Sequence, residues 1–164
     1  MARKVFFSFH YARDAWRVAQ VRNCWLVRAG HETQPFLDGA AWESIKRQGD
    51  TAIKRWIDRQ LAGTSVTVVL IGAATALRPY VQYEIAQSVN ERKGLLGIRI
   101  HNLKDQNGAH DAMGANPFQF FQVARGLGYS VALSSIIPVY DWVQQDGRRN
   151  MGEWIERAAT TVGR

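Results

Sequence analysis

The chain has 164 residues, which is enough for one domain with a hydrophobic core. Its hydrophobic fraction of 46% and charged fraction of 21% are those of ordinary globular proteins, and no apolar run approaches the roughly 20 residues that span a bilayer. The apolar stretch at residues 5–9 is shorter than a signal-peptide core of about 7–15 residues. We therefore expect a cytoplasmic protein without a membrane partner. Its one cysteine, Cys24, excludes an internal disulfide.

The net charge of +7 restricts the classes of partner. A basic balance occurs in proteins that bind nucleic acids and in proteins that bind small anions. The basic residues are scattered, with no block of five or more and no interleaved aromatic residues on which bases could stack. The pattern disfavours a nucleic-acid partner. It is compatible with a solvated basic surface and with a field that attracts the pyrophosphate of a dinucleotide.

The N-terminal half alternates short apolar strands with amphipathic helices. Residues 4–9 predict a buried strand because they are β-branched and aromatic. Asp14 and Asp50 are expected to cap the two helices that follow, since aspartate is a favoured residue at helix starts. The expected elements of this half are a strand at 4–9, a helix at 14–29, a short strand at 34–37, a loop at 39–49 and a helix at 50–61.

The C-terminal half continues the alternation with one long interruption. Residues 65–71, Ser-Val-Thr-Val-Val-Leu-Ile, form a near-continuous apolar run, which is typical of a strand buried on both faces in a parallel sheet. Residues 101–130 are rich in Asn, Asp, Gln and Gly, so we expect a long irregular insertion there. The expected elements of this half are a strand at 65–71, a helix at 78–93, a strand at 95–100, the insertion at 101–130 with one short helix near 117–124, a strand at 136–143 and a helix at 149–161.

This order of elements predicts an α/β fold in a single domain of residues 1–164. Strands that alternate with helices form βαβ units, here an open, flavodoxin-like parallel sheet of about five strands with helices on both faces. Such sheets bind ligands in the crevice beyond the carboxyl ends of their strands. The chemistry is therefore expected after residues 8, 38 and 72, and in the first turns of the helices that follow.

Several motifs of this fold class are absent. The sequence contains no phosphate-binding G-x-x-x-x-G-K-[ST] motif, no G-x-G-x-x-G after the first strand and no G-x-S-x-G. The four histidines are dispersed and no C-x-x-C occurs, so we expect neither a metal site nor a resident cofactor.

One acidic residue stands out against these absences. Glu84 falls in the second turn of the helix that follows the strongest strand. Val81, Ile85 and Val89 form the stripe that would pack on the sheet, and Tyr80 lies one turn before Glu84 on the adjacent face. Helix side chains lean toward the N-terminus, so Glu84 would point to the strand carboxyl ends. From the pattern alone, a solvated surface glutamate is the alternative.

The segment Lys4–Tyr11, Lys-Val-Phe-Phe-Ser-Phe-His-Tyr, resembles the opening strand of TIR domains. It is most similar to the TIR-like proteins of the Thoeris anti-phage defence system, the ThsB family. The similarity continues in order along nearly the whole chain. Its further segments are 21–23, 36–38, 42–43, 64–72, 83–85, 98–104, 116–118 and 139–147. Two departures are Tyr80, where the family often has tryptophan, and an insertion at 101–130 that is shorter than in some relatives.

The resemblance implies a TIR-like fold and an NAD nucleosidase or ADP-ribosyl cyclase activity, with NAD as substrate. It assigns the catalytic role to Glu84, whose carboxylate would stabilise the positive ribose as nicotinamide leaves. Attack by water would give ADP-ribose, and attack by a hydroxyl of the same molecule would give a cyclic isomer. Thoeris relatives make such a signal nucleotide after an unidentified phage trigger, and the nucleotide activates a separate effector protein.

The resemblance and the strand-end positions together nominate substrate-binding residues around Glu84. Ser8 and Asp38 would hold ribose hydroxyls, although Asp38 could equally stabilise its own loop. The candidates for stacking on nicotinamide or adenine are Phe7, Phe9, Tyr11, Trp42, Tyr80 and Tyr83. For the phenylalanines, core packing is the alternative.

The resemblance to TIR domains leads to two further hypotheses. In TIR enzymes the loop after the second strand contacts a neighbouring subunit, so residues 39–49 would complete the site through self-association. The main alternative to the enzyme is a catalytically silent TIR-like adaptor that self-associates.

Overall fold

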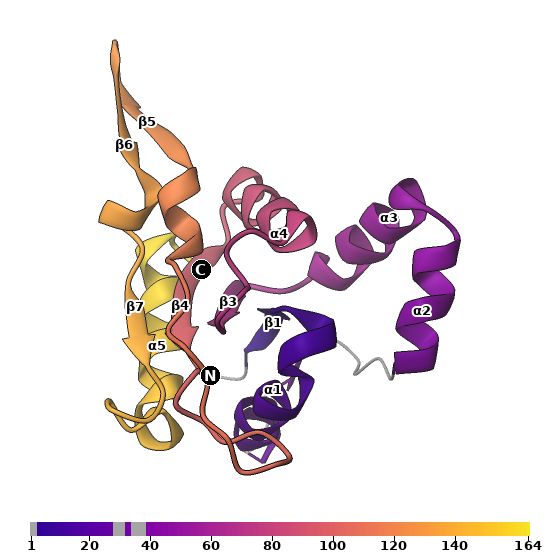
Figure 1. Ribbon diagram of the computed structural model, residues 1–164. Helices are drawn as coiled ribbons and strands as arrows, with labels where there is room; N and C mark the ends of the chain where they lie inside the picture. The colour runs from indigo at the N-terminus through magenta and orange to yellow at the C-terminus, as the bar shows by residue number, and fades with distance from the viewer. Residues whose placement is uncertain (1–2, 28–31, 34–38) are drawn as a thin grey trace.

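The structure is a computed structural model that describes residues 3–27, 32–33 and 39–164 (Figure 1). Within these residues the main sheet has five parallel strands in the order β2-β1-β3-β4-β7. This order confirms the predicted flavodoxin-like α/β sheet. Its strands are β1 (Lys4–Ser8), β2 (Glu32–Thr33), β3 (Val66–Ile71), β4 (Gly94–Arg99) and β7 (Val139–Asp141).

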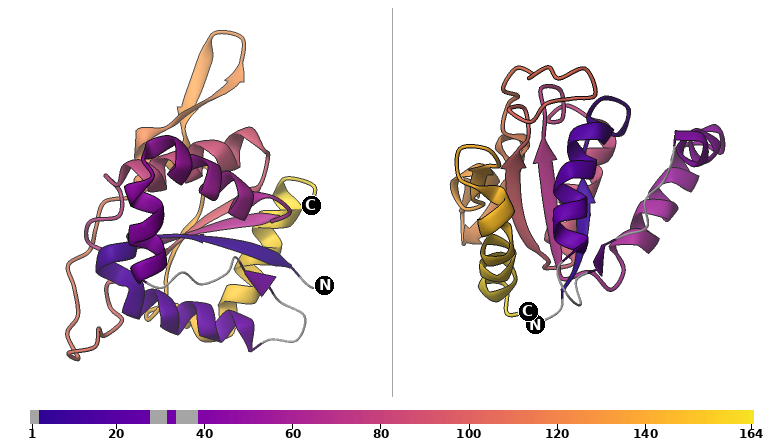
Figure 2. Two further views of the ribbon diagram at one scale, coloured as in Figure 1. Left: turned by 90° about the vertical axis from the view of Figure 1, so that its right-hand side faces the viewer. Right: turned by 90° about the horizontal axis from the view of Figure 1, so that it is seen from below.

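Helices cover both faces of the sheet, as Figure 2 shows. Alternation along β1 explains the division, since neighbouring side chains point to opposite faces. Phe7 packs with α1 (Tyr11–Leu26) and α5 (Gly147–Thr161), whereas Phe6 packs with α3 (Asp50–Leu61). The next helix, α4 (Pro79–Asn90), covers β3 and β4 through Val81 and Ile85, with Val89 beside them as predicted. In the described part of the chain, each helix is too short or too polar to cross a lipid bilayer.

Three expectations for the N-terminal half are wrong. Helix α3 begins at Asp50 itself and Gly49 is its N-cap residue, so Asp50 does not cap it. Helix α1 begins at Tyr11, so Asp14 lies buried in its first turn and does not cap it. The expected loop at 39–49 contains helix α2 (Gly39–Arg47). A helix forms there because Trp42 and Ile45, three residues apart, present one apolar face to the cluster around α3. The strand predicted at 34–37 lies outside the described residues.

The insertion at 101–130 is more regular than expected. A short 3-10 helix, η1 (Pro117–Phe120), ends well before residue 124 and is followed by the antiparallel pair β5 (Gln122–Gly126) and β6 (Tyr129–Ala132). Gly126 and Gly128 have φ of 155° and 85°, and these conformations suit glycine in the turn between the strands. The hairpin projects from the body of the domain (Figure 1). A second 3-10 helix, η2 (Leu133–Ser135), leads back to β7.

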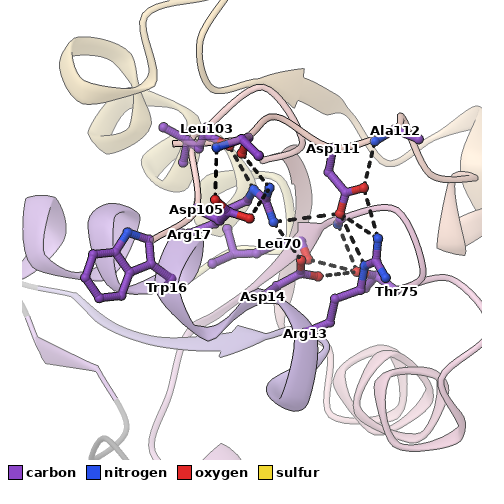
Figure 3. A network of polar contacts seen from close by, with 12 residues as sticks. Arg13, Asp14, Trp16, Arg17, Leu70, Thr75, Leu103, Asp105, Asp111 and Ala112 are labelled. Atoms are coloured by element: carbon purple, nitrogen blue, oxygen red, sulfur yellow. Dashed lines mark hydrogen bonds and ion pairs between the residues drawn. The ribbon is translucent and has the colours of Figure 1, made fainter. Parts of the chain in front are cut away.

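Arg17 ties α1 to the segment that follows β4 (Figure 3). Arg17 is 4% exposed, and its guanidinium donates to the carbonyl oxygens of Leu103 at 2.8 Å and Ala109 at 2.9 Å. It also lies 3.7–3.8 Å from the carboxylates of Asp14, Asp105 and Asp111. This network fixes the start of α1 at the carboxyl edge of the sheet.

We expect Arg17→Gln to lower the free energy of unfolding by about 3–5 kcal/mol, because it leaves the buried Asp14 without its nearest cation. Denaturant unfolding followed by circular dichroism measures the change. The control is Arg157→Gln, whose ion pair with Glu153 is exposed and should contribute at most about 1 kcal/mol. Equal small losses in both variants would contradict a structural role for the network.

Candidate active site

A cavity of about 110 Å³ lies beyond the carboxyl end of β1. This is the side of the sheet predicted from the fold, at the point where the strand order reverses between β1 and β3. The start of α1, helices α2 and α3, and the first turns of α4 contribute its walls. Its lining residues include Phe9, His10, Tyr11, Arg22, Trp42, Lys46, Trp56, Arg78, Tyr80 and Glu84.

Glu84 lines this cavity and is buried, with 8% of the residue exposed. The hydroxyl of Ser8, the last residue of β1, donates a short hydrogen bond to its Oε2. Burial raises the pKa of Glu84 to about 8, and the bond from Ser8 lowers it in part. Desolvation therefore dominates, so the group is mostly protonated at neutral pH before any ligand binds.

Helix α4 holds Glu84 at this place through packing and one polar anchor. Val81 and Ile85 pack on the sheet, which leaves Tyr80 and Glu84 on the cavity side. One turn later the hydroxyl of Ser88 donates to the carbonyl oxygen of Glu84 at 2.7 Å. The same hydroxyl lies 2.7 Å from the hydroxyl of Thr67 in β3. These buried hydrogen bonds fix the position of α4 along the sheet.

Aromatic rings form one wall of the cavity. Phe9 stacks on Tyr11 with centroids 5.4 Å apart, and Tyr11 stacks on Trp42 at 5.2 Å. Trp42 then meets Tyr80 edge to face at 6.4 Å. The structure thus brings together four of the predicted aromatic residues from three helices and the end of β1. Trp56 of α3, which was not among the predicted site residues, extends this wall, with its ring centroid 6.0 Å from that of Trp42.

Three of the predicted substrate-binding residues have no support from the geometry of the cavity. Phe7 borders the cavity, but it is 1% exposed and packs in the core with α1 and α5, which was the alternative for it. The hydroxyl of Tyr83 donates to Asp58 of α3 at 2.8 Å, and its side chain is not among the lining residues. The geometry gives no support to substrate binding by Tyr83. Asp38 lies outside the described residues.

Sequence analysis missed the charged residues and the histidine of the lining. Arg22, Lys46 and Arg78 come from α1, α2 and the residue before α4, and His10 follows β1. No motif marks them, because they are single residues on separate elements. The net charge of +7 indicates an excess of basic residues, but it does not show which of them line a site. Burial, followed by the charges of Arg78 and Arg13, lowers the pKa of His10, so its imidazole is neutral at physiological pH.

Residues 6–105 match the family model described as Thoeris protein ThsB, TIR-like domain. The chain belongs to this family. The matched region contains the last three residues of β1, all of α4 and every cavity residue named above, whereas the hairpin β5–β6 lies beyond it. Membership confirms the TIR-like resemblance, and with it the Thoeris system as the context of the protein.

A curated relative extends the match to nearly the whole chain. It is a protein of Bacillus cereus (strain MSX-D12) named "Putative cyclic ADP-D-ribose synthase ThsB1", which is 35% identical over 194 residues. The comparison covers 94% of this chain and 100% of the relative. Since 194 aligned positions exceed the 164 residues of this chain, the ThsB1 relative carries insertions that this chain lacks.

The raised pKa of Glu84 predicts that the stability of the fold depends on pH. As the pH rises from about 4.5 to about 8, the unfolded chain ionises Glu84 while the folded chain keeps it protonated, so folding loses stability over this range. We expect Glu84→Gln to be more stable than the wild type by roughly 4–5 kcal/mol at pH 8.5 and equally stable near pH 4. Chemical denaturation at both pH values measures the difference.

The control for this prediction is Glu153→Gln, which changes an exposed carboxylate on α5. We expect no pH-dependent gain there. A Glu84→Gln protein whose advantage is the same at both pH values would contradict the raised pKa.

Proposed function

We propose that the protein cleaves the bond between nicotinamide and ribose in NAD and converts the rest into an ADP-ribose-derived, cyclic signal nucleotide. One observation carries the proposal: a single carboxyl group, that of Glu84, is buried beside an aromatic wall at the ligand-binding edge of the sheet. The name of the Bacillus cereus relative supports the same chemistry and substrate class.

One carboxylate is sufficient for this reaction. Glycoside cleavage ordinarily needs a second carboxyl group to protonate the leaving group. Nicotinamide leaves NAD as a neutral molecule from a cationic ring, so no acid is required. The ribose becomes oxocarbenium-like, and the ionised Glu84 would stabilise that positive charge across a short distance in a poorly solvated site.

Substrate itself would supply the charge that ionises Glu84. Before binding, the group is mostly protonated at neutral pH because its pKa is about 8. The positively charged nicotinamide riboside end of NAD would favour the ionised form, since an opposite charge nearby lowers a carboxyl pKa. Ser8 would hold the carboxylate in place and, with it, a ribose hydroxyl.

The aromatic wall would decide which nucleophile attacks. Phe9, Tyr11, Trp42 and Tyr80 offer faces on which nicotinamide or adenine can stack. An aromatic wall beside the ribose would keep water from that side, and exclusion of water favours attack by a hydroxyl of the bound molecule over hydrolysis. The product is then a cyclic isomer.

In the cell, the protein would act in the cytoplasm after a phage trigger, and the nucleotide would activate a separate effector protein. NAD serves as substrate, and no resident cofactor takes part. Residues 39–49, now seen to contain α2, would contact a neighbouring subunit and complete the site through self-association.

The first test compares infected cells that carry the wild type, Glu84→Gln or Glu153→Gln. We expect a new ADP-ribose-type nucleotide with the wild type and Glu153→Gln, and none with Glu84→Gln, because only that substitution removes the charge that stabilises the ribose cation. Mass spectrometry of lysates measures the nucleotide, and its fragmentation separates a cyclic isomer from ADP-ribose. Protection from phage that survives Glu84→Gln without any nucleotide change would support the silent adaptor instead.

The second test is the pH dependence of the triggered enzyme. For free enzyme with Glu84 of pKa about 8, kcat/KM for NAD should rise about tenfold per pH unit from pH 6 and level off above pH 8. Ser8→Ala should move the inflection to higher pH, because the hydrogen bond from Ser8 favours the ionised form. A profile that is flat from pH 6 to 9 would contradict this role of Glu84.

A further inference from the structure

The cavity is too small for a whole dinucleotide. Its volume of about 110 Å³ lies below the range of roughly 300–1,000 Å³ typical of small-molecule sites. Given the proposed function, the nicotinamide ribose is the part of NAD that lies beside Glu84, because the bond between nicotinamide and ribose is the one that breaks. The pyrophosphate and adenosine must therefore leave the cavity across its rim.

The charges that line the cavity are mostly positive. Arg22, Lys46 and Arg78 are fixed cations, and Glu84 is the single carboxyl group among the described lining residues. With Glu84 largely protonated, the site has a positive field at neutral pH. Such a field attracts the doubly negative pyrophosphate of NAD.

Arg78 differs from the other basic residues of this region in its availability. Lys46 pairs with Glu43 at 3.0 Å, and Arg13 forms a bidentate pair with Asp111 at 2.9 Å. Arg78 is exposed, and in the part of the chain that the structure describes no carboxylate pairs with it. A guanidinium in this state can bind two phosphate oxygens without breaking an existing ion pair.

The position of Arg78 is a second reason to expect that it binds an anion. It is the residue at the N-cap of α4, and its side chain makes no capping hydrogen bond. The positive end of the α4 dipole therefore lies at the backbone of Arg78, on the cavity side, and the dipole and the guanidinium both favour an anion. Glu84 is six residues further on, about 9 Å along the helix axis. One helix thus presents a cation at the rim and the catalytic carboxyl inside.

We propose that Arg78 determines specificity for dinucleotides by binding the pyrophosphate of NAD while the nicotinamide ribose lies against Glu84. The inference rests on the proposed function and adds to it. It predicts that Arg78 distinguishes ligands that contain a pyrophosphate from ligands that do not.

The test measures binding by isothermal titration calorimetry on Glu84→Gln protein, in which NAD stays intact. Arg78→Gln and Arg78→Lys are added to this background, and the ligands are NAD, ADP-ribose and nicotinamide riboside. We expect Arg78→Gln to weaken the Kd for NAD and ADP-ribose about tenfold and to leave that for nicotinamide riboside unchanged. Arg78→Lys should recover part of the loss, because it keeps the charge without the fork.

The matched control is Arg125→Gln, which removes the same charge from the projecting hairpin outside the cavity. It should change no Kd, and its thermal stability should match that of Arg78→Gln. Unchanged NAD binding in Arg78→Gln, or equal weakening of nicotinamide riboside, would overturn the role of Arg78. The proposed function would survive such a result if infected cells that carry the wild type still make the nucleotide. Failure of the protein to bind NAD and ADP-ribose, together with no nucleotide in infected cells, would overturn both.

Discussion

The burial of one carboxyl group is the constraint on which the site depends. Glu84 lies in an apolar cavity where its charged form is poorly solvated, and the hydrogen bond from Ser8 offsets that cost only in part. The surrounding fold holds it there: α4 packs on β3 and β4, and the hydroxyls of Thr67 and Ser88 fix the backbone of the helix beside Glu84. Under the proposed function, a destabilised carboxylate is an expected feature, because a group that must stabilise a cation in substrate costs stability in its absence.

The fold could be predicted from sequence because its strands carry their own signal. The apolar run at β3 and the aromatic run at β1 are buried on both faces, and such runs occur mainly in parallel sheets. Helix α2 was missed because its apolar face consists of little more than Trp42 and Ile45, and its neighbours are ambiguous between helix and loop. The hairpin was missed for a different reason. The composition of residues 101–130, rich in Asn, Asp, Gln and Gly, predicts irregular structure, whereas the positive φ values of Gly126 and Gly128 serve a turn between two strands.

The site was predictable only in part. Glu84 and Tyr80 share a helix, so their spacing placed them on one face, and both line the cavity. Phe9 and Tyr11 follow from the end of β1. Tyr83 lies elsewhere: it is adjacent to Glu84 in sequence, but a helix turns by about 100° per residue, and the hydroxyl of Tyr83 donates to Asp58 of α3. Arg22, Lys46 and Arg78 could not be found, because only the folded chain brings three separate helices to one rim.

The contact between Ser8 and Glu84 joins residues 76 positions apart. Parallel strands require a crossover between each pair, so no short stretch of this chain contains both walls of the cavity. During translation, the cavity cannot form until α4 has left the ribosome and packed on β3. Long-range pairing of this kind is slow and cooperative, so the cavity forms with the sheet as a whole. Fragments and half-made chains therefore carry the residues of the site without its chemistry.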